Sequence, residues 1–160
     1  MILVAFGTWT MPFHRLLKEI EILVKSGFLK EHVIVQTGNT PCTSDLFEHQ
    51  PFFDKADFER LYEEASFVIV QAGEGSIMHG LKSNKKVISV ARLAKYQEHI
   101  DDHQLDILST FVEKGYILGW NEGEMLEDVI NKIPAFQPIP YPFVEEKISD
   151  VIIEYMKKLG

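Results

Sequence analysis

The chain has 160 residues, of which 46% are hydrophobic and 25% charged, and this composition is typical of a globular protein long enough to form one domain with a substantial core. Its net charge of −8 argues against a nucleic-acid binder, because such proteins usually carry a basic excess. The single cysteine, Cys42, excludes an intramolecular disulfide and fits a reducing compartment, so we expect a cytoplasmic protein. The apolar N-terminal run ends at Gly7, which is too short for a signal-peptide core or a membrane span, and any membrane contact is expected to be peripheral or through a partner.

Short apolar runs alternate with amphipathic segments along the chain. The pattern predicts strands at residues 2–6, 33–36, 67–70, 86–90 and 116–120, with a further short strand within 46–53. It predicts helices at residues 13–25, 57–65, 99–113 and 122–132, and one that begins at Ser76. Residues 133–160 are expected to hold a proline-rich crossing and a last amphipathic helix over 144–158, so residues 1–160 are interpreted as one domain.

This alternation of strands and helices predicts an α/β fold, a Rossmann-like parallel sheet with helices on both faces. Ligands of such folds bind beyond the carboxyl ends of the strands. The loops that follow strands are therefore the candidate site, and they cover residues 7–12, 36–42, 71–76 and 91–98.

The loop after the fourth predicted strand carries Gly73-x-Gly75-Ser76 before a helix. A dinucleotide fingerprint would need a third glycine, and that position holds Met78; the pattern also lacks the Gly-Lys pair of a P-loop. One interpretation is a phosphate-binding corner, because a helix N-terminus presents unpaired N–H groups. The other is a tight turn with Ser76 as an ordinary helix N-cap. Gly7-Thr8, another turn after a strand, could face the same ligand or be a plain loop.

Polar residues are densest in segment 92–104. His99 and His103 are four residues apart and are predicted to share a helix face, but no third ligand for a zinc site is evident. Two other interpretations stay open, namely a solvated helix start and a polar wall in which Gln104 and the histidines bind sugar hydroxyls.

Together these segments resemble the family 28 glycosyltransferase C-terminal domain. The resemblance lies in Val-Ala-Phe-Gly-Thr at the first predicted strand, Pro-Phe-His-Arg-Leu after it, and the blocks at residues 36–39, 71–76 and 92–104, which occur in the family's order. It covers about residues 2–120 and is strongest for the small, free-standing catalytic subunits of two-part UDP-sugar transferases, which serve dolichol-linked glycan and bacterial capsule or exopolysaccharide synthesis.

The resemblance implies the C-terminal half of a GT-B fold that binds a UDP-sugar without a metal or another cofactor. It places Gly7, Thr8 and the Gly73 loop near the diphosphate, Phe53 near the uracil, and His103 and Gln104 at the donor sugar. The full set of expected donor-binding residues is Gly7, Thr8, Phe53, Gly73, Gly75, Ser76, His79, Tyr96, His99, His103 and Gln104. A membrane-associated partner subunit would supply the other half, the surface for a lipid-linked acceptor, and the general base.

Two positions depart from the family pattern. His79 stands where the family often has a glutamate that binds both ribose hydroxyls, and Gln71 stands where histidine is common. A histidine can make one such hydrogen bond but not the bidentate pair of a carboxylate. The predicted reaction is inverting transfer of a hexose-type sugar, and His14 and His103 are weak candidates for its general base in this chain. The alternatives are a non-catalytic nucleotide-sugar-binding or assembly subunit and a UDP-sugar epimerase, for which a second domain would be needed.

Overall fold

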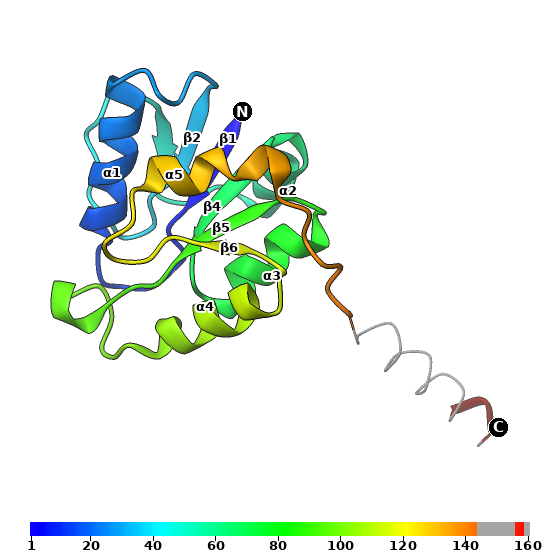
Figure 1. The fold of residues 1–160 in the computed structure, drawn as a ribbon. Helices are drawn as coiled ribbons and strands as arrows, with labels where there is room; N and C mark the ends of the chain where they lie inside the picture. Colours follow the sequence, from blue (N-terminus) through cyan, green and yellow to red (C-terminus); the bar gives the residue numbers. More distant parts are fainter. Residues whose placement is uncertain (144–155, 159–160) are drawn as a thin grey trace.

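The computed structural model describes residues 1–143 and 156–158, so most of the predicted helix over 144–158 lies outside the described residues. Six parallel strands form one sheet (Figure 1). The strands are β1 (Ile2–Ala5), β2 (Val33–Gln36), β3 (Glu48–Gln50), β4 (Phe67–Gln71), β5 (Val87–Val90) and β6 (Leu118–Gly119). The helices are α1 (His14–Lys25), α2 (Lys55–Glu64), α3 (Glu74–Lys82), α4 (His103–Glu113) and α5 (Leu126–Asn131), with 3-10 turns η1 (Ala94–Tyr96) and η2 (Ile133–Ala135).

The strand order is β3-β2-β1-β4-β5-β6, which confirms the predicted Rossmann-like parallel sheet. β1 is central, and its Ile2 lies in register with Val33 of β2 on one side and Phe67 of β4 on the other. The chain first builds the sheet outward to β3 and then crosses back to the other side of β1. In sheets of this kind the crevice forms where the direction of building reverses, which is between β1 and β4.

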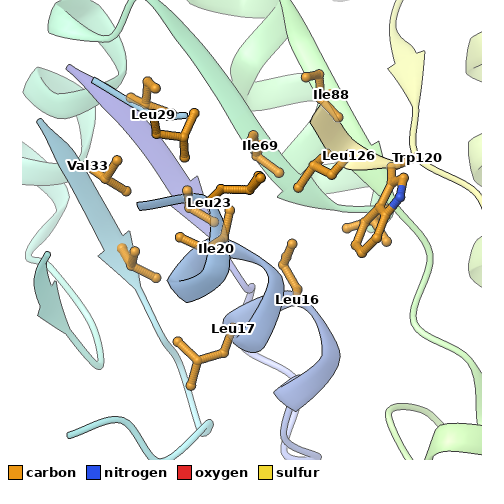
Figure 2. Close-up of a cluster of buried hydrophobic side chains, with 14 of the residues drawn as sticks. Leu16, Leu17, Ile20, Leu23, Leu29, Val33, Ile69, Ile88, Trp120 and Leu126 are labelled. Atoms are coloured by element: carbon orange, nitrogen blue, oxygen red, sulfur yellow. The ribbon is translucent and has the colours of Figure 1, made fainter. Parts of the chain in front are cut away.

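Alternate residues of the strands face opposite layers of helices. Ile2 and Val4 belong to the core under α1 and α5, whereas Leu3 and Ala5 belong to the core under α2, α3 and α4. Figure 1 shows α1 and α5 together on one side of the sheet. The first core is shown in Figure 2, where labelled side chains of α1 such as Ile20 and Leu23 lie among those of the strands. The continuous apolar runs of β1, β4 and β5 follow from this burial on both faces, because neither side of these strands meets water.

Several helices begin at residues other than those predicted, and side-chain hydrogen bonds explain two of the differences. α2 begins two residues early because the Asp54 carboxylate accepts from the Asp57 N–H at 2.8 Å and caps the helix. α5 begins at Leu126 and not at Glu122, since the Trp120 indole N–H donates to the Glu124 carbonyl at 2.9 Å and holds these residues in a turn.

The helix predicted from His99 begins only at His103. The residues before it form a folded loop, in which the Glu98 carboxylate accepts from the Leu93 N–H and the Asp102 carboxylate accepts from the Ala94 N–H. The prediction that His99 and His103 share a helix face is therefore wrong. Local side-chain acceptors for backbone N–H groups compete with the helix here.

Candidate functional site

A cleft of about 360 Å³ opens at the carboxyl ends of β1 and β4, where the strand order predicts a crevice. Three parts of the fold meet there: the turn after β1, the first turns of α3, and one face of α2. The residues that line the cleft are Ala5, Gly7, Thr8, Gln36, Phe58, Tyr62, Gln71, Gly75, Ser76 and His79.

The N-terminus of α3 forms one side of the cleft. Gly73 is the N-cap and provides no side-chain cap, while Gly75 and Ser76 of the first turn line the cleft. Ser76 is thus the third residue of the helix and not its N-cap, which corrects that interpretation. The first N–H groups of a helix lack intrahelical partners, and the helix dipole adds partial positive charge. Beyond its own helical turn, a Cβ placed on Gly75 would meet none of the described residues within 4 Å, so the space in front of this turn is open.

The turn after β1 forms the opposite side. Gly7 has a φ of +78°, which other residues adopt only with strain, and a Cβ there would lie 2.5 Å from Gln71 Nε2. The Gln71 side chain also lies against Gly73, where a Cβ would meet the same amide. A side chain at either glycine would displace the Gln71 amide, which lies between the two turns.

An aromatic wall formed by Phe58, Tyr62 and His79 closes the cleft. The His79 ring stacks on Tyr62 with 4.0 Å between ring centroids, and the Phe58 ring meets both in edge-on contacts. Burial lowers the pKa of His79; Glu59 raises it and Lys82 lowers it further, both by smaller amounts. Burial also raises the pKa of Tyr62, whose buried hydroxyl has no hydrogen-bond partner among the described residues.

The structure brings together five of the expected donor-binding residues in the lining of the cleft, which are Gly7, Thr8, Gly75, Ser76 and His79. Gly73 lies beside them as the α3 N-cap. Phe53 packs against the core under α2, and its N–H donates to Gln36 Oε1 at 3.0 Å. Phe58 and Tyr62 were assigned to the apolar stripe of a helix, and only their pairing with His79 shows that this stripe also reaches the cleft.

The other expected residues, all in segment 92–104, do not line this cleft. His99 stacks on Trp9 with 4.4 Å between ring centroids. Tyr96 donates its hydroxyl to Glu122 at 2.5 Å, and His103 is exposed at the start of α4. His14 is also exposed, at the start of α1.

Segment 92–104 is held by a buried charge network. Arg92 is 1% exposed, and its guanidinium donates to the Met11 carbonyl at 2.7 Å, while the Glu98 carboxylate accepts from Arg15 at 2.9 and 3.1 Å. Burial lowers the pKa of Arg92 to about 10, so this side chain stays charged at neutral pH, and Glu98 partly opposes the shift. The network joins the loop after β5 to the loop after β1 and to α1, which gives much of this polar segment a structural role.

Among residues 1–143 and 156–158, no three histidine, cysteine, aspartate or glutamate side chains are placed to hold one metal ion. In the same part of the chain, no helix is both long enough and apolar enough to cross a membrane.

The cleft lies at the reversal point of a parallel sheet and is built from a glycine turn and a helix N-terminus. A family model, the glycosyltransferase family 28 C-terminal domain, matches residues 1–147. The chain belongs to this family. No curated protein matched the chain.

Solved glycosyltransferase structures share the fold. The glycosyltransferase of kitacinnamycin superposes with a TM-score of 0.61 at 15% identity over 84% of this chain and 33% of its own length. An NMR structure of ALG13 gives a TM-score of 0.54 at 20% identity, with 89% of each chain covered. MurG from Acinetobacter baumannii gives 0.52 at 17% identity over 84% of this chain and 40% of its own. The chain therefore spans about a third of the kitacinnamycin enzyme but most of ALG13.

Proposed function

We propose that the chain is the donor-binding catalytic subunit of an inverting glycosyltransferase, which moves a hexose-type sugar from a UDP-sugar to a lipid-linked acceptor. One observation carries the proposal: the glycine turn after β1 and the open N-terminus of α3 face one cleft at the reversal point of the sheet. That arrangement suits a diphosphate. Family membership supports the same class of ligand.

We expect different residues around the cleft to bind different parts of the donor. The N–H groups of the first turn of α3, with the Ser76 hydroxyl, would receive the diphosphate. Phe58 and His79, which pack against the buried Tyr62 ring, offer apolar surface to the nucleoside. His79 would contribute a single hydrogen bond to the ribose, since a neutral imidazole has one donor and one acceptor.

In the proposed reaction an acceptor hydroxyl oxygen attacks the anomeric carbon and forms the new glycosidic bond. The bond from that carbon to the β-phosphate oxygen breaks, and its electron pair leaves with UDP. The α3 dipole and its N–H groups stabilise the charge that grows on the diphosphate, so the mechanism as proposed routes no step through a metal. A general base takes the hydroxyl proton. We assign the base to a partner subunit, because His14 and His103 do not line the cleft.

We propose a partner subunit because neither candidate base in this chain, His14 or His103, lines the cleft. A membrane-associated partner would then provide the acceptor half and hold the complex at the inner face of the membrane, with this chain in the cytoplasm. Bacterial capsule or exopolysaccharide synthesis is the proposed setting.

The test is reconstitution of the chain with the product of a neighbouring gene that encodes a short protein with one membrane helix. Radiolabelled UDP-sugars and a lipid-linked acceptor are added, and transfer to lipid is measured. We expect transfer only when both subunits are present. The contrary result is UDP-sugar binding without transfer by the reconstituted pair. It would favour a second function, a non-catalytic nucleotide-sugar-binding or assembly subunit, which the histidine at position 79 already favours.

A further inference from the structure

We propose that Gln104 is a positioning residue, which acts through Gln71 to turn an amide N–H toward the diphosphate in the cleft. This inference rests on the proposed function, because it assigns the ligand of that same cleft. It also reassigns Gln104, which the family resemblance places at the donor sugar.

Three hydrogen bonds connect the loop after β5 to the cleft. The Arg92 backbone N–H donates to Gln104 Oε1 at 2.9 Å. Gln104 Nε2 donates to Gln71 Oε1 at 2.6 Å, and Gln71 Nε2 donates to Ser76 Oγ at 3.2 Å. Gln71 and Ser76 line the cleft, whereas Gln104 does not and is 6% exposed. We call Arg92 N–H, Gln104, Gln71 and Ser76 the amide relay.

The direction of the relay follows from its first member. A backbone N–H can only donate, so Gln104 must turn its oxygen toward Arg92 and its nitrogen toward Gln71. Gln71 must then present its oxygen to Gln104, which leaves its nitrogen on the side of Ser76 and the cleft. Hydrogen-bond networks of this kind decide the orientation of a side-chain amide, and here each of the two amides has only one orientation that satisfies its bonds.

The relay has a chemical consequence for an anion. The Gln71 amide nitrogen has two N–H groups, and the bond to Ser76 uses one of them. Ser76 accepts that bond and keeps its own hydroxyl proton for donation. An amide turned the other way would present a carbonyl oxygen to the diphosphate and repel it. Gln104 therefore affects binding without contacting the ligand, since both of its polar atoms are already bonded within the protein.

The test compares UDP and uridine binding by calorimetry for wild type, Gln104→Met, Gln104→Glu and the control Gln137→Met, in which an exposed glutamine is replaced. Gln104→Met removes the relay, and we expect UDP affinity to fall about tenfold or more while uridine affinity is unchanged. Gln137→Met should bind both ligands as wild type does. If Gln104 has a purely structural role, Gln104→Met should instead lower the affinities for UDP and uridine equally. This result would overturn the proposal.

Gln104→Glu provides a rescue. As a carboxylate at pH 8 it accepts from Arg92 but cannot donate to Gln71, so UDP binding should be weak. When protonated it has a donor and an acceptor in the places of the amide, and burial raises the pKa of such a carboxyl toward the accessible range. UDP affinity relative to wild type should therefore recover as the pH is lowered to 5.5. No recovery, in a variant that stays folded, would contradict the relay.

Other groups that titrate near the relay are shared by all variants. His79 faces the same cleft, Arg92 and Glu98 lie in the loop after β5, and Asp102 and His103 lie at the start of α4. At each pH, the UDP affinity of Gln104→Glu is therefore divided by the affinities of wild type and of Gln104→Met in the same buffer. These ratios remove the effects of the shared groups and of the titration of UDP itself.

Failure of the proposed function is distinguishable from failure of the relay. In the first case wild type itself binds neither UDP nor uridine, which also removes the ligand assigned here. The relay has a readout without any ligand, because the side-chain amide signals of Gln71 in a ¹⁵N spectrum should shift in Gln104→Met. Unchanged Gln71 signals would overturn the relay even if wild type binds UDP.

Discussion

Two polar regions at the carboxyl edge of the sheet use their polar groups in opposite ways. At the β1/β4 corner, a glycine N-cap and an open first turn leave backbone N–H groups facing a cleft. In the loop after β5, Arg92 is directed into backbone carbonyls, and Glu98 is bonded to Arg15 and to a backbone N–H. The first region is open and presents backbone N–H groups to the cleft, whereas the charged side chains of the second region are bonded within the protein.

The difference shows that polar density in a sequence does not by itself locate a binding site. Segment 92–104 is richer in charged and histidine residues, yet much of it stabilises the loop. The corner after β4 has few functional groups in its side chains, and its binding capacity comes from backbone N–H groups that glycine leaves accessible. The following changes should separate the two regions, beginning with the largest expected effect.

Glu98→Ala should lower the free energy of unfolding by about 3 kcal/mol, because it leaves the partly buried Arg15 without its carboxylate. Urea denaturation followed by circular dichroism measures this effect. Glu122→Ala is the control, since it removes an ion pair with Lys95 on the surface, and it should change stability little. Equal effects of the two substitutions would mean that the buried network does not stabilise the loop.

Gly75→Val should weaken UDP binding at least tenfold, or by about 1.4 kcal/mol, because the branched side chain would occupy the open space in front of α3. Calorimetry measures the affinity, and thermal unfolding should show a folded protein. Ala56→Val is a matched control, as Ala56 is the second residue of α2 just as Gly75 is the second residue of α3. Unchanged UDP affinity in folded Gly75→Val would remove the phosphate assignment.

His79→Glu should tighten binding of both UDP and uridine by about threefold to tenfold, because a carboxylate can accept from two ribose hydroxyls at once. Uridine lacks the phosphates, so it reports on the nucleoside end of the cleft alone. If neither affinity changes, the ribose does not lie beside position 79.

Wild type should lose a small part of its stability as the pH falls, and His79→Phe should lose less. Burial lowers the pKa of His79, so below the ordinary value of 6.5 the unfolded chain binds a proton that the folded chain takes up less readily. The stabilising contribution is complete above pH 6.5 and declines as the pH falls toward the folded pKa. Phenylalanine keeps an aromatic ring against Tyr62 without this proton. Parallel melting curves between pH 5 and 8 would contradict the assignment.

The strands and the location of the cleft could be predicted from local pattern. Apolar runs such as residues 2–6 have one stable environment, a strand covered on both faces, and the alternation with helices requires parallel strands. Gly7 and Gly73 also mark the points where the chain leaves a strand, at the edge where the carboxyl ends of a parallel sheet converge. These features depend on residues that are close together in the sequence, so one sequence is enough to predict them.

The roles of individual side chains depended on partners far along the chain. Gln104 was placed at a sugar by its family position, but a backbone N–H twelve residues before it and a glutamine thirty-three residues before it hold both ends of its amide. His99 lies outside the predicted helix because the Glu98 and Asp102 carboxylates accept hydrogen bonds from backbone N–H groups of the same loop. Spacing alone cannot predict such bonds, because they form only after packing has brought the loops together.

The sequence by itself determined the α/β class, the order of elements and the corner from Gln71 to Gly75, since these follow from periodicity and from a strand that ends at glycines before a helix N-terminus. Only the tertiary structure decided what fills that corner. The Gln71 amide lies between Gly7 and Gly73, oriented from Arg92 through Gln104, and His79 lies against Tyr62. These hydrogen bonds and this ring stacking join elements that are far apart in the sequence, so they form only in the folded protein.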